Sequence, residues 1–83
     1  MGRSASSLTD PQRLALREAE RLFDEWRRAK EAVIAAESRL WEEALAAPGG
    51  QPPPALAAET LRLRQAARDA HARLTAALAD LPS

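Results

Sequence analysis

The sequence predicts an all-α protein, a two-helix antiparallel coiled-coil hairpin that dimerises into a four-helix bundle. Two apolar seams carry this prediction, because both repeat with steps of three and four residues, the spacing that keeps one face of a helix apolar. The first seam consists of Ala19, Leu22, Trp26, Ala29, Val33, Ala36, Leu40 and Ala47. The second seam consists of Leu56, Thr60, Leu63, Ala67, Ala70, Leu74, Ala77 and Leu81. A Pro/Gly segment over 48–54 lies between the seams, and we expect the chain to turn there.

The first helix is expected over about 9–47. Thr9 or Asp10 can cap its first turn, Pro11 suits the first helical positions, and Gln12 completes a capping box with Thr9. No Gly or Pro interrupts the chain from there to the Pro/Gly segment. The first helix should therefore be roughly 55 Å long, at 1.5 Å per residue.

The loop is expected over 48–54, with its run of prolines in an extended polyproline conformation. Pro54 is well placed to open a second helix, which should run to about 81 and stop before Pro82. Residues 1–8 are expected to form a flexible N-terminal tail, so that 9–83 make up the helical domain.

Aligning the seams in antiparallel register predicts which layers meet. Trp26 is expected against Ala77, because a large residue facing a small one keeps the layer volume constant. In this register the start of the first helix, including Leu14, Leu16 and Ala19, lies beyond the reach of the second helix.

The charged residues beside the seams agree with this register in part. Glu37 is expected near Arg64 and can form an ion pair, whereas Glu25 is expected near Asp80, a mismatch of two acids. Because an exposed ion pair contributes only about 0–1 kcal/mol, the register depends on the apolar layers.

A second apolar row is left over once the seams are paired. It consists of Leu16, Phe23, Ile34, Trp41, Leu45, Leu61 and Leu78. We expect these residues, which we call the lateral stripe, to lie on one side of the hairpin and to form a protein interface. The preferred arrangement is two hairpins packed stripe to stripe as a homodimer. The alternative is that the row belongs to the core of a single hairpin whose seams are slightly rotated.

The composition argues against several classes of protein. Lys+Arg and Asp+Glu balance at 12 each, whereas nucleic-acid binders and polybasic membrane anchors carry a basic excess. No apolar run approaches the roughly 20 residues of a membrane span. The chain has no Cys, which removes disulfides and Cys-ligated zinc. Together with an N-terminus unlike a secretory signal, this composition predicts a cytoplasmic protein.

No pattern of catalytic residues is evident. His71 is the single histidine, and it has no Cys or second His with which to bind a metal. Gly49 and Gly50 follow a helix and precede prolines, which is the wrong context for a phosphate-binding loop. We therefore expect no enzyme, no cofactor, no metal and no small-molecule substrate, unless dimerisation were to gather arginines and acids around a shared pocket.

The sequence accordingly predicts a small interaction or scaffold module that binds itself or another helical protein. One alternative is an RNA- or DNA-binding hairpin that uses the arginines of the second helix. These arginines are Arg62, Arg64, Arg68 and Arg73.

A further alternative is a small secretion-type helical hairpin or chaperone. Some bacterial secretion substrates are small helical hairpins with a Trp-x-Gly motif in the turn between their helices. The turn here reads Ala47-Pro48-Gly49-Gly50-Gln51 and contains no Trp, so we do not assign the chain to that family.

Overall fold

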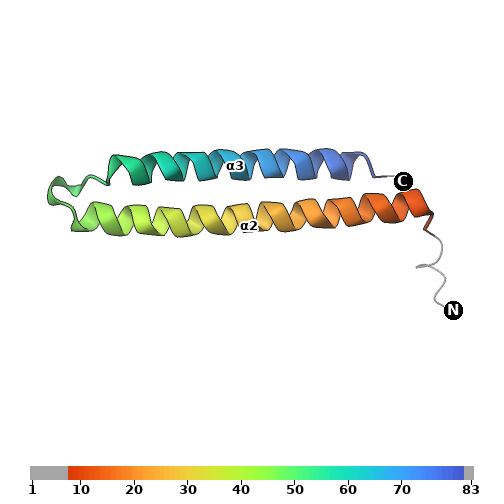
Figure 1. The fold of residues 1–83 in the computed structure, drawn as a ribbon, viewed down its shortest axis with the longest axis horizontal. Helices are drawn as coiled ribbons and strands as arrows, with labels where there is room; N and C mark the ends of the chain where they lie inside the picture. The colour runs from red at the N-terminus through yellow and green to blue at the C-terminus, as the bar shows by residue number, and fades with distance from the viewer. Residues whose placement is uncertain (1–7, 82–83) are drawn as a thin grey trace.

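The computed structural model describes residues 8–81, which form two long helices joined by a short bend (Figure 1). Helix α2 spans Asp10–Ala46, a single 3-10 turn η1 spans Pro48–Gly50, and helix α3 spans Pro54–Ala79. Helices α2 and α3 lie side by side and run in opposite directions, which confirms the predicted helical hairpin. Of the predicted tail over 1–8, all but Leu8 lies outside the described residues.

Helix α2 begins with the predicted capping box. The Thr9 backbone N–H donates to Oε1 of Gln12 at 2.8 Å, and the Gln12 backbone N–H donates to Oγ1 of Thr9 at 3.3 Å. The helix ends before Ala47, whose φ of −81° and ψ of 143° are extended. Ala47 leaves the helical region because the ring of Pro48 clashes with a helical conformation of the residue before it.

Two glycines and an extended proline segment form the loop. Gly49 and Gly50 have φ values of 82° and 70°, which L-residues with side chains adopt only at a cost. Gln51 and Pro53 then have φ/ψ of −106°/133° and −59°/136°, in the extended and polyproline region. Pro54 opens helix α3 as predicted.

The predicted seams form the hairpin core. Every residue of both seams is buried or half-buried. The fully buried residues are Ala19, Leu22, Ala36, Ala44, Leu56, Thr60, Ala70 and Leu74. Thr60 is 1% exposed, and its hydroxyl donates to the backbone oxygen of Leu56 at 2.8 Å, so this buried polar group has a partner. Ala44 is a core residue that lies outside both predicted seams.

The register differs from the predicted one by about a heptad. The ring of Trp26 lies against the ring of His71, with centroids 5.4 Å apart, so Trp26 is level with His71 rather than with Ala77. At the other end of the hairpin, Pro52 of the loop already lies beside Ala44 of α2. The predicted layer pairing was therefore wrong, although the faces that meet are the predicted ones.

The extended segment 51–53 accounts for this shift. Polyproline rises about 3.1 Å per residue, so three residues cover about 9 Å, the rise of roughly six helical residues. The segment runs back along α2 by that distance before α3 begins. Because the seams repeat about every seven residues, the shift leaves them facing each other. Ala36 and Leu22 of the first seam and Thr60 and Leu74 of the second seam are all buried.

Helix α2 projects past the end of α3 at the open end of the hairpin (Figure 1). The two helices contain 37 and 26 residues, and this difference of about 16 Å is divided between the open end and the loop end, where α3 begins short of the end of α2. This overhang is shorter than predicted, because Ala19 is buried and hence within reach of α3. Leu14 and Leu16 are exposed.

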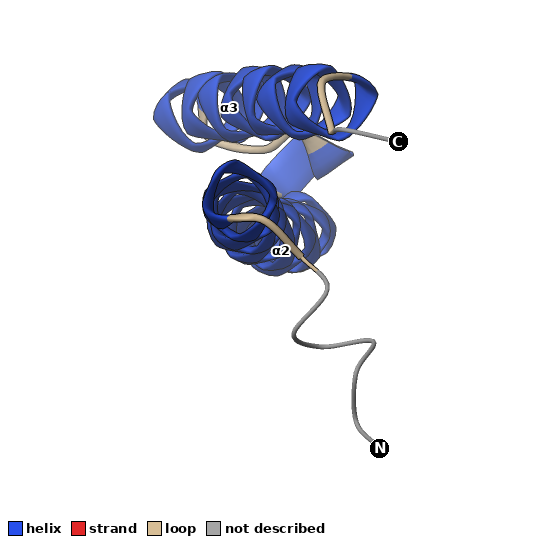
Figure 2. Ribbon diagram, turned by 90° about the vertical axis from the view of Figure 1, so that its right-hand side faces the viewer, coloured by secondary structure: helices blue, strands red, loops and turns tan. Residues whose placement is uncertain are grey.

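Among residues 8–81, the only long helix that packs against α2 is α3. Figure 2, which looks along the hairpin, shows α3 on one side of α2. The fully buried apolar residues among 8–81 are four alanines and three leucines. A core of this size is small, and chains of this length commonly gain stability by association. No helix among the described residues is both long and apolar enough to cross a membrane.

Candidate functional site

All seven residues of the lateral stripe are exposed in the hairpin. Their exposed fractions range from 39% for Leu16 to 83% for Leu45, and Trp41 is 69% exposed. The alternative that they belong to the hairpin core was therefore wrong. Among residues 8–81, eight large apolar side chains are exposed, whereas three large ones are fully buried.

The helical repeat places the α2 members of the stripe on one flank of the hairpin. Leu16 and Phe23 are separated by seven residues, as are Ile34 and Trp41, and both Phe23–Ile34 and Ile34–Leu45 are separated by eleven. Separations of seven and eleven residues return a side chain to nearly the same direction, since a helix has 3.6 residues per turn. We call this side of the hairpin the striped flank.

Helix α3 contributes fewer apolar residues to the striped flank. Leu78 follows His71 by seven residues, and His71 contacts Trp26 of α2. Leu61 precedes Arg68 by seven residues, and Arg68 shares a groove with Ile34. The α3 side of the striped flank therefore has leucines towards its ends and polar residues at its middle.

An aromatic cluster lies at the edge between the seam and the striped flank. The ring of Trp26 packs edge-on against Phe23, with centroids 5.7 Å apart, and also contacts His71. Nζ of Lys30 lies 4.6 Å from the centroid of the Trp26 ring, a favourable cation–π distance. Trp26 thus contacts both Lys30 of α2 and His71 of α3.

A shallow groove runs between the helices at the middle of the striped flank. Its lining consists of Lys30, Val33, Ile34, Glu37, Arg64, Ala67 and Arg68. The predicted ion pair is present here, because Nη2 and Nε of Arg64 lie 2.7 and 2.9 Å from Oε2 of Glu37. The groove combines apolar side chains with three cations and one carboxylate.

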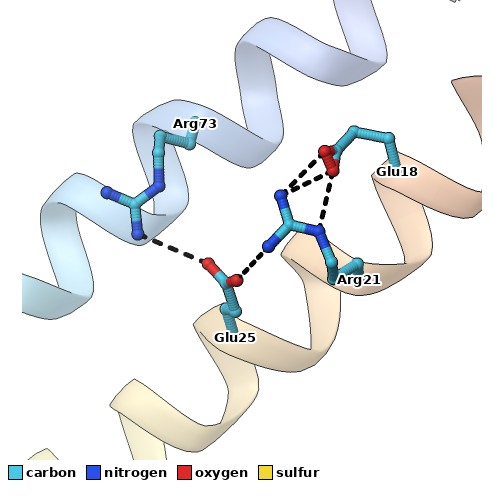
Figure 3. A network of polar contacts seen from close by, with 4 residues as sticks. All are labelled: Glu18, Arg21, Glu25 and Arg73. Atoms are coloured by element: carbon cyan, nitrogen blue, oxygen red, sulfur yellow. Dashed lines mark hydrogen bonds and ion pairs between the residues drawn. The ribbon is translucent and has the colours of Figure 1, made fainter.

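The opposite flank of the hairpin is polar. Figure 3 shows Arg21 between Glu18 and Glu25, and Glu25 reaching across to Arg73 of α3 at 3.5 Å. The hydrogen bond and the charge of Glu18 raise the pKa of Arg21 above its ordinary value. Glu25 thus has two cationic partners, and its predicted proximity to Asp80 was wrong because the register is shifted.

The two flanks differ sharply in character. Arg21 and Phe23 are two residues apart, which places them about 200° apart around α2. One flank thus carries an ion-pair network that water can solvate, whereas the other exposes a Trp, a Phe and an Ile. The striped flank is the candidate functional site.

The arginines of α3 do not form a single row. Arg64 and Arg68 line the groove of the striped flank, whereas Arg73 joins the network on the opposite flank. Arg62 is eleven residues before Arg73 and hence on the same side as it. Two of the four arginines also pair with acids of α2, so they are partly neutralised.

Groups for metal binding do not converge in the described part of the chain, where no three His, Asp or Glu side chains lie close enough to hold an ion. The groove cations Lys30, Arg64 and Arg68 were not identified together as a site by sequence reasoning. Their positions in the sequence could have indicated this grouping. All three lie near the middle of their helices, and the middles of two antiparallel helices lie side by side.

Comparison with protein-family models, with curated proteins and with solved structures finds no match to this chain.

Proposed function

We propose that this chain is a small protein–protein interaction or scaffold module, without catalytic activity, that self-associates through the lateral stripe. The observation that carries the proposal is the exposure of all seven stripe residues on one flank of a hairpin with a small core. Contiguous exposed apolar patches of this kind mark contact surfaces in soluble proteins. Trp41 and Phe23 are aromatic anchors of the type that dominates interface energies.

The size of the striped flank favours a second copy as its occupant. Helix α3 contains 26 residues and is thus about 39 Å long, and two helices side by side are about 20 Å wide. The flank therefore offers roughly 800 Å², about what each partner buries in a standard stable interface. Two flanks face to face would give a four-helix bundle, and two-fold homodimers are the commonest oligomers.

The polar character of the opposite flank also favours the striped flank as the interface. Its Glu18–Arg21–Glu25–Arg73 network is exposed and already satisfied within one chain, so this flank has little to gain from burial. The proposal includes a cytoplasmic location, with which a chain free of cysteine is compatible.

The fluorescence of Trp41 tests the proposal. In a Trp26→Phe variant Trp41 is the single fluorophore, and its emission should move to shorter wavelength as the protein concentration rises, because association removes its exposed ring from water. The matched control is Trp41→Phe, which retains the half-buried Trp26 and should shift less. Emission of Trp41 that is independent of concentration, in a protein of monomeric mass, would count against the proposal.

A further inference from the structure

The cations of the groove lie at the midpoint of the hairpin. Helix α2 spans Asp10–Ala46 and Lys30 is close to its centre, while Arg64 and Arg68 lie on either side of the centre of α3. All three line the same groove, with Glu37 as the one carboxylate in it. Each hairpin therefore has an excess of two positive charges at the centre of its striped flank.

Self-association places these centres together. A two-fold pairing that overlaps the full length of both hairpins sets the middle of one striped flank on the middle of the other. The opposed grooves then contain an excess of four positive charges, and like charges facing each other in an interface oppose binding. The partner's groove cannot relieve this excess, because it contains the same residues.

The groove residues are arranged to accept an added anion. Arg64 is fixed by its two contacts with Glu37, and Lys30 is held over the ring of Trp26. Arg68 takes part in no ion pair within residues 8–81. A guanidinium group presents a planar set of N–H donors that matches two oxygens of a phosphate or sulfate. Val33, Ile34 and Ala67 supply an apolar surround in which such contacts are strengthened.

We infer that the two grooves together bind a multivalent oxyanion of the phosphate or sulfate class at the centre of the dimer, so that self-association depends on this anion. The inference rests on the proposed function, because one groove alone is an open half of the site. Glu37 limits the charge excess of each groove, so a small anion with two to four negative charges suffices to balance the pair.

Sedimentation equilibrium of the full chain with inorganic pyrophosphate as the probe tests this inference. Millimolar pyrophosphate, compared with sodium chloride at equal ionic strength, should tighten the dimer about tenfold or more. Low concentrations keep the general strengthening of apolar contacts by such salts small. Arg68→Gln should tighten the dimer in chloride and remove its response to pyrophosphate. The matched control is Arg62→Gln, which makes the same change on the opposite flank and should behave as the wild type.

The outcomes separate the inference from the proposed function. A dimer with equal affinity in both salts, unaffected by Arg68→Gln, overturns the anion site and leaves the interface standing. A monomer under every condition overturns both. A short single-stranded oligonucleotide at equal phosphate concentration is the last probe. If the oligonucleotide tightens the dimer and pyrophosphate does not, the inferred site for a small free oxyanion is overturned.

Discussion

Trp41→Glu should convert the dimer into single chains at concentrations where the wild type is paired. Trp41 is 69% exposed in the hairpin, so the substitution removes little from the core of a single chain. In the proposed bundle the same side chain is an interface anchor, and its replacement by a carboxylate should cost about 2 kcal/mol or more, roughly thirtyfold in dissociation constant. Mass by light scattering on a sizing column measures the effect.

Leu14→Glu is the matched control for this experiment. Leu14 is 64% exposed on the same helix, but it lies outside the lateral stripe. The control should keep the wild-type mass, because it adds the same charge to a surface that stays in water. If Trp41→Glu keeps the wild-type mass, or if both variants dissociate equally, the lateral stripe is not the interface.

Leu74→Ala should destabilise the fold by about 2–5 kcal/mol, the usual range for a buried leucine. Leu74 is 6% exposed and lies in the second seam, which packs against α2. A domain of this size has only about 5–10 kcal/mol of stability, so the loss is a large fraction of the total. Chemical denaturation followed by circular dichroism, at one fixed protein concentration, measures the change.

Two comparisons make the stability measurement specific. Leu14→Ala should change the free energy of unfolding by less than about 0.5 kcal/mol, because Leu14 is exposed. The loss of stability caused by Leu63→Ala should lie between those caused by Leu74→Ala and Leu14→Ala, since Leu63 is half-buried. Equal effects of Leu74→Ala and Leu14→Ala would mean that the seam is not the core of the protein.

Local features of the fold could be predicted from the sequence. The capping box of Thr9 and Gln12 depends on residues three apart, and its two hydrogen bonds form as expected. The seam faces follow from helical periodicity alone, which is why each seam residue is at least half-buried. The apolar residues outside the seams could therefore be predicted as a separate row, and the seven residues of the lateral stripe are indeed exposed.

The register could not be predicted in the same way. A seam that repeats about every seven residues pairs equally well after a shift of one heptad, so the apolar pattern alone does not distinguish the two registers. The extended segment 51–53 decides between them, because it carries the chain back along α2. Contacts between the helices depend on that shift. The Glu25–Arg73 pair and the Trp26–His71 contact were missed for this reason.

The groove at the middle of the striped flank escaped prediction for a related reason. Lys30 belongs to α2, whereas Arg64 and Arg68 belong to α3, so their proximity is a property of the pairing and not of either helix. The predicted pair of Glu37 and Arg64 forms despite the shift in register, because long flexible side chains tolerate such a shift better than short ones do.

The absolute mass of the wild-type chain, measured by light scattering at two protein concentrations, tests the central claim most directly. Self-association through the lateral stripe predicts a mass of twice the chain's 9.0 kDa at the higher concentration, with a fall towards one chain on dilution below the dissociation constant. A mass of 9.0 kDa at both concentrations, with and without pyrophosphate, would contradict it.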